Sequence, residues 1–233
     1  IKKKFIFKHI GFLIIGIQLL KIFLITKVIY FMTIKIITFS GVDGAGKSTL
    51  IECVNKELKS NGYRVIKKRS RPEILPILSS FKYGKRNAEN RATIALPRLG
   101  GNRSRFTSFL RFAYYFLDYV IGQTFIRIKY RSNKDILIYD RYYFDYIIDP
   151  IRANIVLPKN FINFFYRFID KPDLNIFLFA PSYEIFKRKN ELDEKTINIL
   201  TENYKKLFTN LDKNRNERYL IIENISLEKS SSV

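Results

Sequence analysis

A glycine-rich stretch at residues 41–49 lies between an apolar run typical of a buried β-strand (34–40) and a run with helical periodicity (47–61). The stretch matches the pattern G-x-x-x-x-G-K-[ST], in which glycines allow positive φ and leave no Cβ in the way, so that successive backbone N–H groups can surround a phosphate. An incidental glycine-rich turn is the alternative, and the order of strand, loop and helix argues against it. The sequence therefore predicts a binding loop for a nucleoside triphosphate. Its residues are Gly41, Val42, Asp43, Gly44, Ala45, Gly46, Lys47, Ser48 and Thr49.

The last residues of this motif supply a cation and a metal ligand. The ammonium group of Lys47 can reach the β and γ phosphates of a bound triphosphate, and the Ser48 hydroxyl can bind Mg²⁺. The helix that begins near Lys47 also directs the positive end of its dipole at the phosphates. We therefore expect the triphosphate to bind together with Mg²⁺.

The rest of the chain alternates between short apolar runs and longer segments with helical periodicity. This alternation predicts a parallel sheet, whose ligands lie beyond the carboxyl ends of the strands. We predict a three-layer α/β/α fold in which helices flank five parallel strands. The expected strands are 34–40, 63–68, 135–139, 174–180 and 219–223; the expected helices are 47–61, 106–131, 160–169, 182–191 and 193–213; and a basic loop is expected at 83–105.

An acidic and a basic residue, Asp140 and Arg141, directly follow the third of these strands. A carboxylate at the carboxyl end of a buried strand is where such a fold holds Mg²⁺, usually through water. The Arg141 guanidinium can stabilise negative charge on a transferring phosphoryl group. A helix cap is the alternative role for Asp140. Together with the glycine-rich loop, this pair predicts the second half of a nucleotide site.

The charge of the chain indicates an anionic partner. The net charge is +21, and residues 64–131 hold 16 Lys or Arg against three acidic residues. Nucleotide phosphates, acidic lipids and nucleic acid would all suit such a surface, although solvated lysine-rich faces account for part of the excess. Nucleic acid is not expected, because this segment shows no known nucleic-acid motif. The single histidine, His9, lies outside the nucleotide-binding region, which excludes a histidine-based metal site or catalytic triad there.

Residues 1–31 form a strongly apolar N-terminal region with six lysines and no acidic residue. Its longest charge-free stretch, residues 9–20, is shorter than the roughly 18–20 residues that span a bilayer. Three interpretations remain: a fragment of a longer chain, an upstream start in front of Met32, or a membrane-associated segment. We expect one nucleotide-binding domain at 32–226, a tail at 227–233 and a cytoplasmic location, with membrane association through the N-terminal region as the alternative.

Three stretches together resemble the thymidylate kinase family, and the resemblance covers residues 34–223. They read F-S-G-V-D-G-A-G-K-S-T-L at 39–50, D-R-Y at 140–142 and P-D-L-N-I-F-L-F-A-P-S-Y-E-I-F-K-R-K at 172–189. The resemblance implies phosphoryl transfer from MgATP to a phosphate-bearing small molecule, often in a homodimer. The implied catalytic residues are Lys47, Asp140, Arg141 and Arg188; the implied Mg²⁺ ligands are Ser48 and Asp140; and the expected acceptor contacts are Asp43, Arg71, Arg141 and Tyr142. Arg188 and Lys189 would close over ATP as lid cations, and a solvated helix end explains them equally well.

The departures from the family pattern fall on the acceptor side. Residues 70–74 replace the usual R-E-P-G-G, the segment 112–119 lacks the usual arginine, and 143–150 replaces a Ser/Ala-rich continuation. These features resemble a divergent thymidylate-kinase-like group proposed to serve surface-polysaccharide pathways. The leading hypothesis is therefore dTMP + ATP to dTDP + ADP, and the alternative is a kinase for a sugar phosphate, a polyol phosphate or a glycan end. An ATP-binding scaffold and a nucleic-acid-binding NTPase complete the list of hypotheses.

Overall fold

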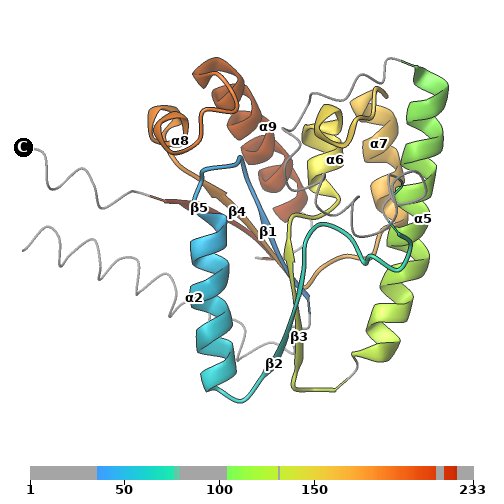
Figure 1. Cartoon of the computed structure of the whole chain (residues 1–233), viewed down its shortest axis with the longest axis vertical. Helices are drawn as coiled ribbons and strands as arrows, with labels where there is room; N and C mark the ends of the chain where they lie inside the picture. Colours follow the sequence, from blue (N-terminus) through green and yellow to red (C-terminus); the bar gives the residue numbers. More distant parts are fainter. Residues whose placement is uncertain (1–35, 77, 79–103, 131, 214–217, 225–233) are drawn as a thin grey trace, which may run out of the picture.

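The computed structural model describes residues 36–76, 78, 104–130, 132–213 and 218–224 (Figure 1). The predicted N-terminal region 1–31, the tail 227–233 and nearly all of the basic loop 83–105 lie outside these ranges. Among the helices within the ranges, none has both the length and the hydropathy that a bilayer crossing needs.

Five parallel strands form one sheet, as predicted. Their order is β2-β3-β1-β4-β5, so β1 lies at the centre between β3 and β4. Phe39 pairs with Asp140 in this register, which places the end of β1 beside the end of β3. The glycine-rich loop and the Asp-Arg pair therefore leave the sheet side by side. The strands are β1 (Ile36–Ser40), β2 (Arg64–Lys68), β3 (Asp135–Asp140), β4 (Leu174–Phe179) and β5 (Tyr219–Glu223).

The strand order decides which helices cover which face. The first crossover moves from β1 outward past β3 to β2, whereas each later crossover moves in the opposite direction across the sheet. Because crossovers between parallel strands are right-handed, the first helix lies on one face and the later helices on the other (Figure 1). The first face carries α2 (Lys47–Ser60), and the second carries α5 (Arg105–Lys129), α6 (Phe144–Ile148), α7 (Lys159–Phe165) and α9 (Glu194–Asp212).

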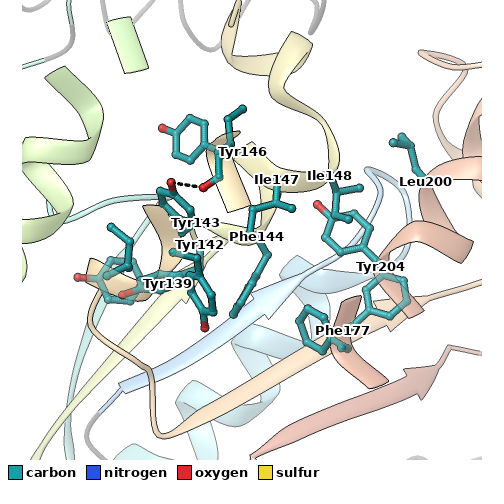
Figure 2. Packing of buried hydrophobic residues seen from close by; sticks show 14 of the residues in the cluster. Tyr139, Tyr142, Tyr143, Phe144, Tyr146, Ile147, Ile148, Phe177, Leu200 and Tyr204 are labelled. Carbon is teal, nitrogen blue, oxygen red and sulfur yellow. Dashed lines mark hydrogen bonds between the residues drawn. The ribbon is translucent and has the colours of Figure 1, made fainter. Parts of the chain in front are cut away.

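The two faces have different cores. Aliphatic side chains, including Ile37, Val54 and Ile138, fill the space under α2. Tyrosine and phenylalanine dominate the other face, where residues 142–144 pass through the centre of the cluster (Figure 2). Each buried tyrosine hydroxyl in this stretch has an acceptor: Tyr142 donates to the Asp170 carbonyl at 2.8 Å and Tyr143 to the Ile162 carbonyl at 2.9 Å. This aromatic core anchors the segment that follows Arg141.

The predicted helices differ from the observed ones in several places. The segment expected at 160–169 divides into α7 and the 3₁₀ helix η2 (Tyr166–Phe168), and the helix expected at 182–191 ends early as α8 (Ser182–Arg188). The helix expected from 193 begins one residue later, because the Asp193 side chain accepts from the Thr196 N–H as its cap. Two short elements, α6 and the 3₁₀ helix η1 (Pro150–Ala153), were not predicted.

Candidate active site

The loop between β1 and α2 has the backbone conformation that its glycines allow. Gly41 has φ +143° and Gly46 has φ +90°, values that a residue with a Cβ rarely adopts. A Cβ on Gly41 would also overlap the Leu178 carbonyl oxygen of β4, and one on Gly46 would overlap the Asn224 amide. Asn224 in turn donates from Nδ2 to the Ala45 carbonyl at 2.9 Å. The loop is therefore held against the ends of β4 and β5.

Lys47 lies inside this loop, with a side chain only 6% exposed. Its Nζ donates to the carbonyls of Gly41 and Val42, both at 2.9 Å, and lies 3.7 Å from Asp43 Oδ1. Burial lowers the pKa of Lys47 to about 8, and the neighbouring Arg141 acts in the same direction. The acidic residues around it, Asp43 and Asp140 among them, offset part of this shift.

The pKa of Lys47 predicts how binding of the expected triphosphate depends on pH. Above about pH 8 the free protein loses the Lys47 proton, so we expect kcat/KM for ATP to fall there, whereas kcat falls less because bound phosphates favour the charged amine. Between the folded and unfolded pKa values the unfolded chain holds more protons, so the stability of the free protein should rise with pH in that window. Lys47→Arg is the control, because arginine stays protonated: its residual activity should show no decline near pH 8.

Asp140 and Ser48 fit the predicted Mg²⁺ site. Oδ1 of Asp140 is buried and has no hydrogen-bond partner in the described part of the chain, and Ser48 is exposed at the start of α2 beside the equally exposed Thr49. No group of three or more metal-binding His, Cys, Asp or Glu side chains occurs within the described ranges. This set suits Mg²⁺, which commonly binds one or two protein groups together with substrate phosphates.

Arg141 bridges the glycine-rich loop and α6. Its Nη2 donates to Asp43 Oδ1, and its Nη1 donates to Asp145 Oδ2 and, at 3.3 Å, to the Gly41 carbonyl. Burial by itself would lower the pKa of Arg141, but Asp145 and Asp43 raise it above its usual range. Arg141 is therefore a permanently charged group beside the phosphate loop.

Asp43 is shared by a second arginine, which sequence reasoning missed. Arg152 of η1 pairs with Asp43 Oδ2 at 2.6 Å. Burial would raise the pKa of Asp43, but Arg141, Arg152 and Lys47 outweigh it and hold that pKa well below its usual range. A small pocket next to the loop has Arg152 in its wall; Gly41, Val42, Arg141, Asp145, Asp149, Leu192, Leu200 and Tyr204 complete it. Nothing local in the sequence marked Arg152 or Asn224, because both reach the loop only through the fold.

The predicted lid residues lie at the other side of the loop. Arg188, at the end of α8, donates from Nη1 to the Gly44 carbonyl at 3.2 Å and lies 3.7 Å from Glu184. Lys189 follows the helix and pairs with Glu191 at 3.0 Å. The structure thus places Arg188 beside the glycine-rich loop.

Two expected acceptor contacts lie elsewhere. Tyr142 is fully buried in the aromatic core, with its hydroxyl bound to the Asp170 carbonyl, so it is not available to an acceptor. Arg71 is 5% exposed; it pairs with the fully buried Asp118 of α5 and donates to the Leu75 carbonyl. The structure therefore corrects both expectations. Tyr142 is a core residue, and Arg71 belongs to a buried ion pair between the segment after β2 and α5. Three arginines of the basic loop, Arg98, Arg103 and Arg105, are further candidates for an acceptor phosphate by their charge. Arg98 and Arg103 lie outside the described residues, and Arg105 is the exposed first residue of α5.

The sheet order, the glycine-rich loop and the flanking helices define a three-layer P-loop α/β/α fold. The crystal structure of thymidylate kinase from Ehrlichia chaffeensis is similar, with a TM-score of 0.50 and 18% sequence identity over 82% of this chain and 88% of that chain. At this identity the similarity concerns the fold. No protein-family model and no curated protein matches the sequence.

Proposed function

We propose that this protein transfers a phosphoryl group from MgATP to a small-molecule acceptor. The observation that carries the proposal is the convergence of Lys47, Asp140 and Arg141 around one glycine-rich loop. Asp140 and Arg141 lie at the end of β3, and Lys47 follows the loop that leaves the adjacent strand β1; ligands of parallel α/β sheets bind at this edge. The similarity of the fold to a thymidylate kinase structure agrees with this reaction class.

In this proposal the chain's own residues position phosphates and neutralise charge. Lys47 moves from its loop carbonyls to the β and γ phosphates of ATP, and Arg188 approaches from the lid side. Ser48 and Asp140 would hold Mg²⁺, which when bound neutralises charge on the β and γ oxygens. Arg141 stabilises the phosphoryl group in transfer. An acceptor phosphate is already ionised at neutral pH, so the reaction needs no strong base.

The leading acceptor is dTMP, with dTDP and ADP as products, because the sequence resembles thymidylate kinases. A second candidate is a sugar phosphate, a polyol phosphate or a glycan end, because the departures from the thymidylate kinase pattern fall on the acceptor side, at residues 70–74, 112–119 and 143–150. Two of the four acceptor contacts that the sequence suggested, Arg71 and Tyr142, are buried and bound to other protein groups.

An acceptor panel tests the proposal and separates the two candidates. The full chain is supplied with MgATP and, in turn, dTMP, other nucleoside monophosphates, sugar phosphates and polyol phosphates, and ADP release and product mass are measured. Acceptor-dependent ADP release with the gain of one phosphoryl group supports the proposal, and the productive acceptor identifies the class. Absence of ATP binding in calorimetry with Mg²⁺ would overturn it.

We also infer a homodimer, formed through α5. This helix runs along the outer edge of the molecule (Figure 1) and exposes one apolar stripe at helical spacing. At roughly 180 Å² per side chain and about half exposure, the stripe presents on the order of 700 Å², close to the ~800 Å² that each partner contributes to a stable interface. The stripe consists of Phe106, Phe109, Leu110, Leu117, Ile121, Phe125 and Ile128.

Light scattering after size-exclusion chromatography tests this inference. We expect the wild-type chain to have the mass of a dimer, and Leu117→Glu to shift it to a monomer, because a buried unpaired carboxylate opposes association. Lys56→Glu, an exposed position on α2 at the opposite face of the sheet, is the control and should remain dimeric. A wild-type monomer at micromolar concentration contradicts the inference.

A further inference from the structure

Arg141 sits in a conformation that requires support. Its φ of +91° is rare for a residue with a Cβ, and its side chain is only 12% exposed. The Arg141 N–H donates to the Phe39 carbonyl at 2.8 Å, so the strained backbone is tied to β1. Strained residues of this kind persist only where the surrounding structure holds them, and they concentrate at functional sites.

Asp145 of α6 supplies part of that support. It lies one helical turn after Arg141, near the start of α6, and its side chain is 11% exposed. Oδ2 accepts from Arg141 Nη1, and Oδ1 accepts from the Tyr204 hydroxyl at 2.8 Å. Both carboxylate oxygens are thus committed to donors. Asp145 is suited to fixing the guanidinium plane and not to removing a proton from an acceptor.

Tyr204 connects this carboxylate to the core. It belongs to α9, is 2% exposed, and stacks on Phe177 of β4 with ring centroids 4.9 Å apart at 15°. Figure 2 shows Tyr204 between Phe177 and the α6 segment, with its ring embedded in the aromatic cluster. A hydroxyl on a ring held in this way can occupy few positions. The order of the Arg141 guanidinium therefore depends on packing between α9 and β4.

We propose that Asp145 and Tyr204 are positioning residues that hold Arg141 in line with the phosphate loop. The chain of contacts runs from Phe177 through Tyr204 and Asp145 to Arg141, and from there to Asp43 and the Gly41 carbonyl. This inference rests on the proposed phosphoryl transfer. It assigns a role to two residues, on α6 and α9, that do not belong to the motif pattern.

Positioning predicts an effect on kcat and not on ATP binding. In the described part of the chain no hydrogen bond or ion pair joins Asp145 to Lys47 or to the loop glycines, so MgATP should bind variants at this position about as it binds the wild type. A guanidinium displaced by about 1 Å from the transferring group lowers the rate by roughly 10²-fold. A residue needed only for folding would instead lower the unfolding temperature without separating kcat from KM.

The test measures kcat, KM for ATP and the unfolding temperature in Asp145→Asn and Tyr204→Phe. We expect kcat to fall about 100-fold in Asp145→Asn and about tenfold in Tyr204→Phe, with KM for ATP within about twofold of wild type. Because both changes act through one carboxylate, the double variant should be no slower than Asp145→Asn alone.

Tyr143→Phe is the matched control. Tyr143 is a buried tyrosine directly before α6. Its replacement by phenylalanine removes one hydrogen bond, to the Ile162 carbonyl, and none to Asp145. We expect it to lower stability about as much as Tyr204→Phe and to leave kcat unchanged. Equal kcat values in Tyr204→Phe and Tyr143→Phe would overturn the inference. A wild-type chain that transfers no phosphoryl group would instead refute the proposed function.

Discussion

Replacing Lys47 by methionine is expected to lower kcat for phosphoryl transfer by roughly 10³-fold while the protein stays folded. The lost group is the only lysine ammonium among the described residues that lies inside the phosphate loop, within 2.9 Å of the Gly41 and Val42 carbonyls. Methionine has similar length and an apolar end, so it fits the same buried space. Steady-state kinetics on the productive acceptor measure the loss.

The stability of this variant provides its internal control. Lys47→Met gives up two hydrogen bonds to carbonyls but also removes a buried charge whose pKa is depressed by burial, so these effects oppose each other. We expect the free energy of unfolding to change by less than about 1 kcal/mol. Turnover near the wild-type rate in a folded Lys47→Met protein would remove the basis for the proposed active site.

Asp118→Asn should destabilise the fold by about 3–5 kcal/mol, the largest stability effect that we expect from one substitution. Asp118 is fully buried in α5, where its carboxylate accepts from Arg71 and from the backbone N–H groups of Glu73, Ile74 and Leu75. The NH₂ group of an asparagine would face the Arg71 guanidinium or the backbone N–H groups, which are themselves donors. The buried Arg71 charge would also lose its counter-ion. Urea unfolding measures the change.

Two further variants distinguish this clamp, meaning Asp118 with its four donors Arg71 and the N–H groups of residues 73–75, from a simple ion pair. Arg71→Met should cost less than Asp118→Asn, because three backbone N–H groups still satisfy the carboxylate. Glu202→Ala removes the exposed pair with Lys205 and should change stability by no more than about 0.5 kcal/mol. If Asp118→Asn cost as little as Glu202→Ala, the loop after β2 would not depend on this clamp.

The parts of the site within one continuous motif could be predicted from the sequence. Positive φ at Gly41 and Gly46 and the placement of Lys47 at the start of α2 are local consequences of residue type. The position of Asp140 and Arg141 beside this loop could also be predicted, because they follow an apolar run that marks a buried strand. Local patterns sufficed here because the loop conformation depends on its own glycines, and the end of the strand depends on the apolar run before it.

The acceptor side shows where local patterns stop. Arg71 matched the expectation for a phosphate ligand by charge and by position after the second strand. In the structure it faces Asp118, which lies 47 positions further along the chain, and the buried pair excludes an acceptor. Tyr142 follows Arg141 directly, but the backbone turns at Arg141 and directs the tyrosine ring into the core.

By itself the sequence determined the sheet of five parallel strands, the phosphate loop and the Asp-Arg pair, because apolar runs, glycine conformations and strand ends are encoded by neighbouring residues. Only the tertiary structure decided which charges meet. Three separate segments bring further side chains to the site: Arg152, Tyr204 and Asn224. Arg71 pairs instead with Asp118. The physical reason is that a side chain's partner depends on the packing of distant segments: a buried charge takes the counter-ion that the fold places beside it.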